Sequence, residues 1–270
     1  MVEQIYKRTQ TRAMNGKANF LGLWSLYLRE IKRFSKIYMQ TFFAPIIAAL
    51  LFLSILTLAF RGEGRSAPGI EFSNFITPGL ILMALITSCF ANSSFALMFE
   101  KLTRVIADTL TPPLSPLEIV LGYLLASATR GIFVAVLVSA GVYIFFPFTL
   151  HSPFILTFFC LASAILMSLA GIITGLWADK VDHVASINNF IVLPLTFLSG
   201  TFFSIKYLPD WGLYVTLINP VFYMIDGFRY GWIGYSDRPV FSGIIILTII
   251  NISLFFICIR LFKVGYNLKS

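Results

Sequence analysis

The chain has 270 residues, of which 58% are hydrophobic and only 12% are charged, and its mean hydropathy is +0.85. This composition excludes an ordinary soluble domain and predicts an integral membrane protein. The formal net charge is +8, but no basic surface interleaved with aromatic residues is visible, so we expect no nucleic-acid partner.

The expected fold class is all-α integral membrane, with six transmembrane helices. About 20 apolar residues cross a hydrocarbon core of about 30 Å as a helix. Six runs of that kind occur, at residues 41–60, 75–99, 117–146, 153–178, 184–205 and 241–262. The polar start of the chain is not followed at once by a short apolar core and a small-residue cleavage site, so we expect no cleaved signal peptide.

An amphipathic helix is predicted before the first span. Residues 1–18 are interpreted as a cytoplasmic N-terminal tail and residues 19–40 as an interfacial helix. Its apolar and basic positions recur at helical spacing on opposite faces: Phe20, Trp24, Tyr27, Leu28, Ile31 and Phe34 against Arg29, Lys32, Arg33 and Lys36. The pattern predicts a helix in the membrane interface with its basic face toward anionic lipid or a partner. A soluble amphipathic helix packed on another domain is disfavoured, because no other soluble domain is visible.

The main loop on the N-terminal side follows the second span. Glu100, Arg104 and Asp108 are spaced at i, i+4 and i+8, so we expect them on one face of a helix that Pro112 and Pro113 end. Ser115 then caps a new helix that has proline at its first position. The loop is interpreted as a short charged helix at the membrane surface, and an ordinary solvated connection remains open.

Several polar residues lie inside predicted spans. Arg130 needs a carbonyl, a polar helix face, water or a lipid phosphate as its partner, and both a functional role and a contact between subunits remain open. Two polar patches either line a pathway or join helices by hydrogen bonds, and helix packing is favoured for most of their members: Asn92, Ser93 and Ser94, and Ser186, Asn188 and Asn189.

The distribution of basic residues predicts the orientation. The side of the membrane that holds the N-terminus carries 14 of the 20 lysines and arginines, so both termini are expected in the cytoplasm. The three cysteines fall inside spans and are interpreted as packing residues.

Signatures of catalysis are absent from the sequence. It has no G-x-x-x-x-G-K-[ST] phosphate loop, no G-x-S-x-G elbow and no H-E-x-x-H helix, so we expect no enzyme, no cofactor and no metal in this chain. His151 and His183 are predicted on opposite sides of the membrane. Asp179, Asp182 and His183 cluster in "ADKVDHV", where a solvated turn is favoured over a cation site.

The fifth span breaks down in "FLSGTFFSIKYLPDW", residues 197–211. Irregular backbone at membrane depth is tolerated only where protein or water covers it. We therefore predict that Ser199 and Gly200 end the span, and that residues 209–228 fold back as short re-entrant helices broken at Asn219 and Pro220. Aromatic residues of this segment are expected at the outer interface.

This stretch resembles the permease subunits of ABC-2 type transporters. The family pattern is a Leu-Ser-Gly, a Leu-Pro, an Asn-Pro, a tyrosine and an arginine, which here are Leu198, Ser199, Gly200, Leu208, Pro209, Asn219, Pro220, Tyr223 and Arg229. The resemblance extends to "ITPGL", "FEKLTR" and "TPPLSPLEIVLG" and covers essentially the whole chain. One departure is Ser204, where many relatives carry proline.

The resemblance implies the composition of the whole transporter: a homodimer of this chain in the bacterial inner membrane, in contact with membrane lipid, driven by two copies of a cytoplasmic ATPase that binds ATP and Mg. The transmembrane domain is then 41–262 and the cytoplasmic C-terminal tail 263–270. The loop from Glu100 to Ser115 resembles the coupling helix that docks into the ATPase, and the family signature resembles an external gate. The second and fifth spans resemble the pathway walls, with candidate lining residues Asn92, Ser93, Asn188, Asn189, Phe197 and Phe202.

Family members mostly export drugs, lipid-linked polysaccharides or lipo-oligosaccharides, so the expected cargo is amphipathic. Two alternatives of other classes stay open at this point. One is a stand-alone membrane enzyme acting on lipid, and the other is a passive channel.

Overall fold

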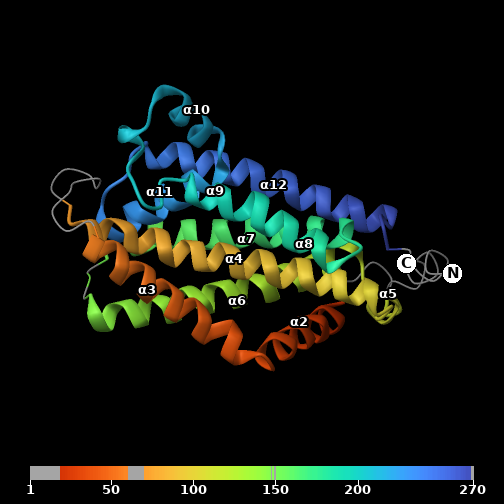
Figure 1. Ribbon diagram of the computed structural model, residues 1–270. Coiled ribbons are helices and arrows are strands. Elements are labelled where there is room, and N and C mark those ends of the chain that lie inside the picture. Colours follow the sequence, from red (N-terminus) through yellow and green to blue (C-terminus); the bar gives the residue numbers. More distant parts are fainter. Residues whose placement is uncertain (1–18, 60–69, 147, 149, 269–270) are drawn as a thin grey trace.

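A computed structural model describes residues 19–59, 70–146, 148 and 150–268 and shows a bundle of long helices lying side by side (Figure 1). The first half of the described chain forms α2 (Phe20–Ser35), a π-helical turn (Met39–Phe43), α3 (Ala44–Ala59), α4 (Phe72–Leu102), α5 (Ile106–Leu110), α6 (Pro116–Phe145) and α7 (Pro153–Trp177). The second half forms α8 (Val181–Ile187), a second π-helical turn (Asn188–Val192), α9 (Leu193–Phe197), a 3-10 turn (Ile205–Tyr207), α10 (Asp210–Ile218), α11 (Pro220–Ile233) and α12 (Val240–Val264). No strand occurs in these residues, and the predicted tail 1–18 lies outside them.

Five helical segments are long and apolar enough to cross a membrane: Thr41–Ala59, α4, α6, α7 and α12. The predicted fifth span is shorter than expected. It begins at Val181, contains the second π-helical turn and ends at Phe197, so the boundaries 184–205 were wrong. The helix ends early because Gly200 adopts a left-handed conformation, with φ of +68°. A total of six spans stays a prediction.

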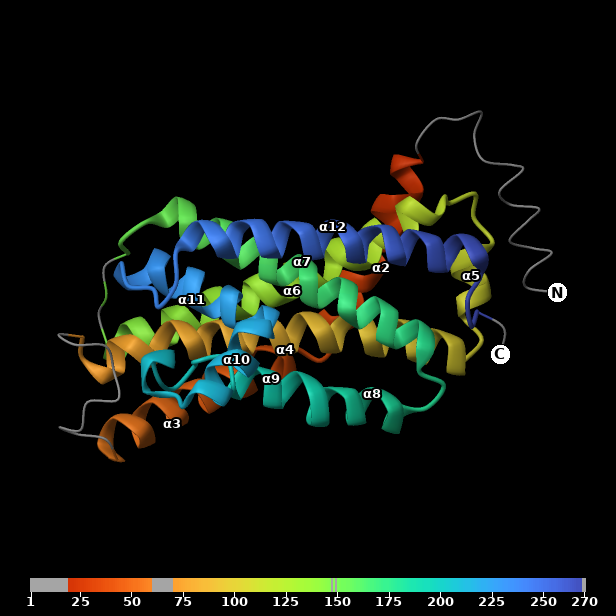
Figure 2. The ribbon, with the colours of Figure 1, turned by 90° about the horizontal axis from the view of Figure 1, so that it is seen from above.

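Helix α4 lies at the centre of the bundle and packs most extensively against α7 and α6 (Figure 2). Glycines of α7 permit the close approach: a Cβ at Gly171 would lie 2.1 Å from Ser93 Oγ, and one at Gly175 would lie 2.7 Å from the Ser94 carbonyl oxygen. Ser93 Oγ donates to the Ser168 carbonyl oxygen at 2.9 Å. Ser93 is fully buried between the two helices. The prediction that Ser93 lines a pathway was therefore wrong, because its hydroxyl serves helix packing.

The two ends of the bundle differ. Helix α5 lies at one end, beside the start of α2 and the last turns of α12, and we call this the α5 end (Figures 1 and 2). Helix α11 runs along only the opposite half of the bundle, where α12 begins, and we call this the α11 end. Helices α10 and α11 meet at Asn219, as the sequence predicts. Their re-entrant position in a membrane stays a prediction.

Candidate functional site

A buried carboxylate joins four helices at the α5 end. Glu100 lies in the last turn of α4, and its Oε1 accepts from Arg29 Nη2 of α2 at 2.6 Å. Its Oε2 accepts from Thr109 Oγ1 of α5 at 2.8 Å and from the Tyr123 hydroxyl of α6 at 2.7 Å. Hydrogen bonds to an ionised carboxylate are stronger than neutral ones. This Glu100 cluster therefore connects the short α5 firmly to two long helices.

A second carboxylate supports the Glu100 cluster from α2. Glu30 is almost fully buried and forms ion pairs with Arg33 at 2.9 Å and with Arg29 at 3.3 Å. Burial raises the pKa of the Glu30 carboxyl, and the charge of Arg33 opposes that shift. Sequence analysis missed Glu30 and Tyr123. The signal for Glu30 was present, because it stands one helical turn from Leu26 and from Phe34, on the face that packs inward.

The predicted orientation of the basic face of α2 was wrong for two of its four members. Arg29 and Arg33 turn into the bundle, toward Glu100, Glu30 and Asn92. Lys32 and Lys36 remain exposed. The cause is the pair of buried carboxylates, which are costly without cationic partners.

The single charged helical face predicted for Glu100, Arg104 and Asp108 was also wrong. Helix α4 ends at Leu102, and Arg104 has a φ of +62°, which turns the chain before α5 begins. Such a conformation is uncommon for a residue with a Cβ. Glu100 points inward, whereas Arg104 and Asp108 are exposed. The three side chains therefore have different surroundings.

The connection from α5 to α6 has the helix end and the helix cap that the sequence predicts. Helix α5 ends at Leu110, just before Pro112 and Pro113. Ser115 caps α6: its Oγ accepts from the Glu118 amide, and Glu118 Oε2 accepts from the Ser115 amide at 2.7 Å.

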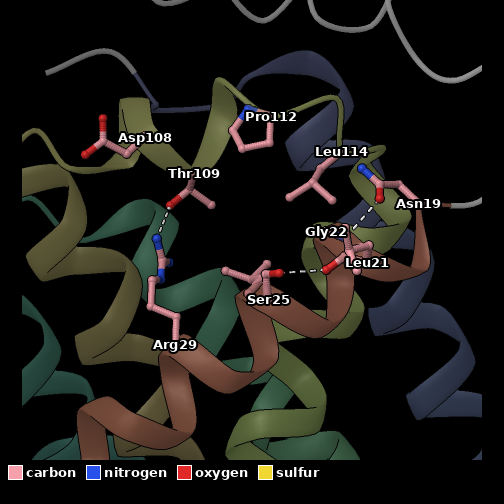
Figure 3. A pocket seen from close by; sticks show the side chains of 10 residues that line it. Asn19, Leu21, Gly22, Ser25, Arg29, Asp108, Thr109, Pro112 and Leu114 are labelled. Atoms are coloured by element: carbon pink, nitrogen blue, oxygen red, sulfur yellow. Dashed lines mark hydrogen bonds between the residues drawn. The ribbon is translucent and has the colours of Figure 1, made fainter.

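A cavity of about 320 Å³ lies between α2 and the connection that follows α5. Figure 3 shows Arg29 directed at Thr109 on one side of it, with Pro112 and Leu114 on the other. The hydrogen bond from Arg29 Nη1 to Thr109 Oγ1 measures 2.9 Å. The α5 surface is therefore hollowed next to the Glu100 cluster.

One face of α4 is left open within the chain. Helix α3 and the α8–α9 segment flank this face on either side (Figure 1). Asn92 is buried beside it, donates to Ser127 Oγ of α6 at 3.0 Å and accepts from Arg130 Nη1 at 3.2 Å. The Asn92 amide thus packs helices together, and Arg130 has a polar helix face as its partner.

The other candidate lining residues lie on the α8–α9 segment and just after it. Asn188 Nδ2 donates to Asn189 Oδ1 at 3.2 Å within the π-helical turn, and Asn189 is exposed. The Phe197 ring stacks on the Phe202 ring with centroids 5.7 Å apart. Their role as pathway lining stays a prediction.

Part of the family signature forms a buried unit at the α11 end, built on Ser199, Asn219 and Arg229, whereas Leu198 and Pro209 are exposed. Arg229 of α11 is fully buried, and its Nη2 donates to the Gly200 carbonyl oxygen at 2.6 Å. Its Nε donates to the Phe75 carbonyl oxygen at 3.3 Å, and its guanidinium lies 4.0 Å from the centre of the Phe75 ring. The left-handed turn at Gly200 and the first turn of α4 are thus held by one side chain.

Asn219 holds the same turn from the other side. Its Nδ2 donates to the Leu195 carbonyl oxygen at 2.7 Å and to Ser199 Oγ at 2.8 Å, while its Oδ1 accepts from the Val221 amide at 3.0 Å and caps α11. Proline follows at the first position of α11. The Tyr223 hydroxyl donates to the Leu217 carbonyl oxygen at 3.0 Å and binds α11 to α10.

Two acidic residues complete this unit, and sequence analysis missed both. Asp226 Oδ1 accepts from the Asp237 amide at 2.8 Å and lies 3.9 Å from Arg229 Nη1. The Asp237 carboxylate accepts from Ser204 Oγ and from the Tyr235 hydroxyl. Ser204, at the position where the resemblance leads one to expect proline, thus contributes a hydrogen bond that proline cannot make.

The fold and site define a multi-pass, all-helical membrane protein in which one central helix joins a polar cluster at one end to a buried signature at the other. The particular family follows from comparison: the family model of the ABC-2 type transporter matches residues 22–233, and the chain belongs to that family. It is 34% identical over 251 residues to a protein named inner membrane transport permease YadH from Escherichia coli strain K12, covering 93% of this chain and 98% of the relative. Relatives with the same name from Escherichia coli O157:H7 and Shigella flexneri match to the same extent. The chain is thus a transport permease of the ABC-2 class, with several membrane-crossing helices.

Proposed function

We propose that this chain is the membrane subunit of an ATP-driven exporter that works as a homodimer with two copies of a separate ATPase. The observation that carries the proposal is the continuity of α4. Glu100 in its last turn is bound to α5, and the Phe75 carbonyl in its first turn is bound to Arg229. A helix of 31 residues is about 46 Å long, so it connects the two sides of a membrane directly.

The ATPase is proposed to dock on α5. Arg104 and Asp108 are exposed there, next to the cavity between α2 and α5. The sequence has no phosphate loop of its own, which is consistent with ATP and Mg bound on the partner. Closure of the ATPase pair would push α5, and the Glu100 cluster would pass that displacement to α4 and α6 as a rigid-body movement.

The α5 end is proposed to face the cytoplasm of a bacterial cell, with both termini on that side. The excess of lysine and arginine near this end supports the orientation. The relatives' printed name places those proteins in an inner membrane. The proposed cargo is amphipathic, such as a drug, a lipid-linked glycan or a lipo-oligosaccharide.

The test separates docking from coupling. The chain is co-purified with its ATPase in nanodiscs, and a fluorophore at Tyr214→Cys, an exposed position on α10, reports ATP-driven movement at the far end. We expect Glu100→Gln to retain the ATPase and its hydrolysis while the fluorescence change is lost. Arg104→Ala is expected to weaken ATPase binding instead.

Asp182→Asn provides a matched control, because Asp182 is an exposed carboxylate on α8. It should leave both readouts unchanged. An unchanged fluorescence response in Glu100→Gln would refute transmission through the Glu100 cluster. Transport by the purified chain in vesicles without ATP would refute the whole proposal.

A further inference from the structure

A second polar cavity lies where α2, α4 and α6 meet. Its volume is about 440 Å³. Its walls combine two arginines and an asparagine with aromatic rings: Arg33, Arg130, Asn92, Phe34, Phe95 and Phe99. Among the residues that the structure describes, no carboxylate lines it. The cavity lining therefore combines cationic and apolar side chains.

The two guanidinium groups compete for one neutral acceptor. Asn92 Oδ1 accepts from Arg33 Nη2 and from Arg130 Nη1, both at 3.2 Å. Arg33 also has Glu30 as a counter-charge at 2.9 Å. Arg130 forms no ion pair with any carboxylate in the described part of the chain, and its Nε is buried without a hydrogen-bond partner.

The local charge is unbalanced as a result. Around the Glu100 cluster and this cavity, three arginines, Arg29, Arg33 and Arg130, face two carboxylates, Glu30 and Glu100. A half-buried cation without a counter-charge is costly, so such a group normally binds an anion. Arg130 has both the Nε donor without a hydrogen-bond partner and the guanidinium charge without a carboxylate partner among the described residues.

A second copy of the chain is poorly suited to supply that anion. Three carboxylates inside the bundle are already bonded within it: Glu30, Glu100 and Glu118. Asp226 is bonded near the α11 end. The exposed Asp108 lies on α5, and the exposed Asp182 lies in the first turn of α8, which packs on α4 near Met98 and not near Asn92. A membrane component is favoured instead.

The surroundings of the cavity match an amphiphile with an anionic headgroup. Arg33 lies in the last turn of α2, close before the first span begins at Thr41, which is the level expected for headgroups. Ile37, which stands between Arg33 and that span, also lines the cavity and is 50% exposed. Guanidinium groups bind phosphate oxygens with two directed donors, and apolar side chains accept hydrocarbon.

We propose that Arg33, Arg130 and Asn92 bind the phosphate of an anionic lipid-like molecule whose hydrocarbon passes Ile37 and follows the first span. The site does not depend on the ATPase or on the identity of the cargo. It would select anionic amphiphiles at the surface of the membrane on the α5 side.

The test compares two lipids with identical acyl chains. The full-length chain is purified in neutral detergent, and retention of phosphatidylglycerol and of phosphatidylcholine is measured by native mass spectrometry and by the shift in unfolding temperature. We expect Arg130→Gln to lower retention of phosphatidylglycerol about tenfold or more, since a charge-assisted contact to phosphate is lost. Lys32→Gln, which removes an exposed charge from the same helix, should retain it.

Two further measurements distinguish loss of the lipid site from a folding defect, and binding of a lipid from binding of a soluble anion. Asn92→Asp places a carboxylate between the two arginines, so this variant should unfold at a higher temperature in neutral detergent and lose its preference for phosphatidylglycerol. Millimolar inorganic phosphate should stabilise the chain much less than the lipid does.

Four results would overturn the proposal. Three are an unchanged lipid preference in Arg130→Gln, an equal loss in Lys32→Gln, and full stabilisation by inorganic phosphate alone. A change of oligomeric state in Arg130→Gln without any lipid preference in the unmodified chain would assign Arg130 to a contact between copies and also overturn it.

Discussion

Replacement of Arg229 by methionine tests the structural role of the family signature most directly. The arginine is fully buried and supplies donors to the Gly200 and Phe75 carbonyl oxygens, at 2.6 and 3.3 Å. It also lies 3.9 Å from Asp226. Methionine keeps much of the volume but removes every donor and leaves Asp226 without its cation.

The expected cost is large for a single substitution. Removing one partner of a buried ion pair destabilises by about 3–5 kcal/mol, because the other charge stays buried. For a chain of this size, about 1 kcal/mol corresponds to about 2–4 °C, so we expect the unfolding temperature to fall by about 6–20 °C. Arg229→Lys retains the charge with fewer donors, and it should lose less.

The measurement is thermal unfolding of the full-length chain in detergent, followed by intrinsic fluorescence. Arg238→Met is the control, because Arg238 is an exposed cation in the loop after α11, and its loss should shift the free energy of unfolding by no more than about 0.5 kcal/mol. If Arg229→Met unfolds within about 2 °C of the unmodified chain, the reasoning is refuted.

Three further substitutions test contacts of the central helices and of the signature turn. Gly200→Ala places a Cβ at a φ of +68°, so we expect a loss of about 1–2 kcal/mol in unfolding experiments together with weaker transport, and normal transport would count against a close-packed turn. Asn219→Ala removes the α11 cap and two donated hydrogen bonds, which should cost about 2–3 kcal/mol, and an unchanged unfolding temperature would contradict this assignment. Gly171→Ala brings a Cβ to 2.1 Å from the Ser93 hydroxyl of α4 and should lower the free energy of unfolding by about 1–3 kcal/mol. Gly212→Ala is the control: the nearest atom to its Cβ is 3.6 Å away, so this variant should be neutral or slightly stabilising. Equal effects of the two substitutions would exclude tight α4–α7 packing as the cause.

Local sequence signals were sufficient for most of the helices. The Ser115 cap with proline after it, the end of α5 before Pro112 and the break at Asn219 all rest on backbone chemistry that acts within a few residues. The resemblance located the family signature, and two pairs of its residues proved to be hydrogen-bonded: Asn219 with Ser199, and Arg229 with the Gly200 carbonyl oxygen.

Other predictions failed because helical spacing reports neither a turn of the backbone nor a contact between distant segments. Helical spacing placed Glu100 and Arg104 on one face, but the left-handed residue at the end of α4 turned the chain between them. Amphipathic spacing placed Arg29 outward, but Glu100 of α4 pairs with it inside the bundle. That partner is not visible from the periodicity of a single helix.

The sequence by itself determined the membrane class and several helix ends, and its resemblance to a known family identified that family and its signature residues. The membrane class follows from composition, and these helix ends follow from chemistry between neighbours in the chain. Only the tertiary structure decided which polar groups meet: Glu100 with α2, α5 and α6, and Arg229 with Gly200 and Phe75. It also left Arg130 without a counter-charge among the described residues. The physical reason is that a buried charge takes its partner from whatever packs against it, and packing is a property of the whole bundle.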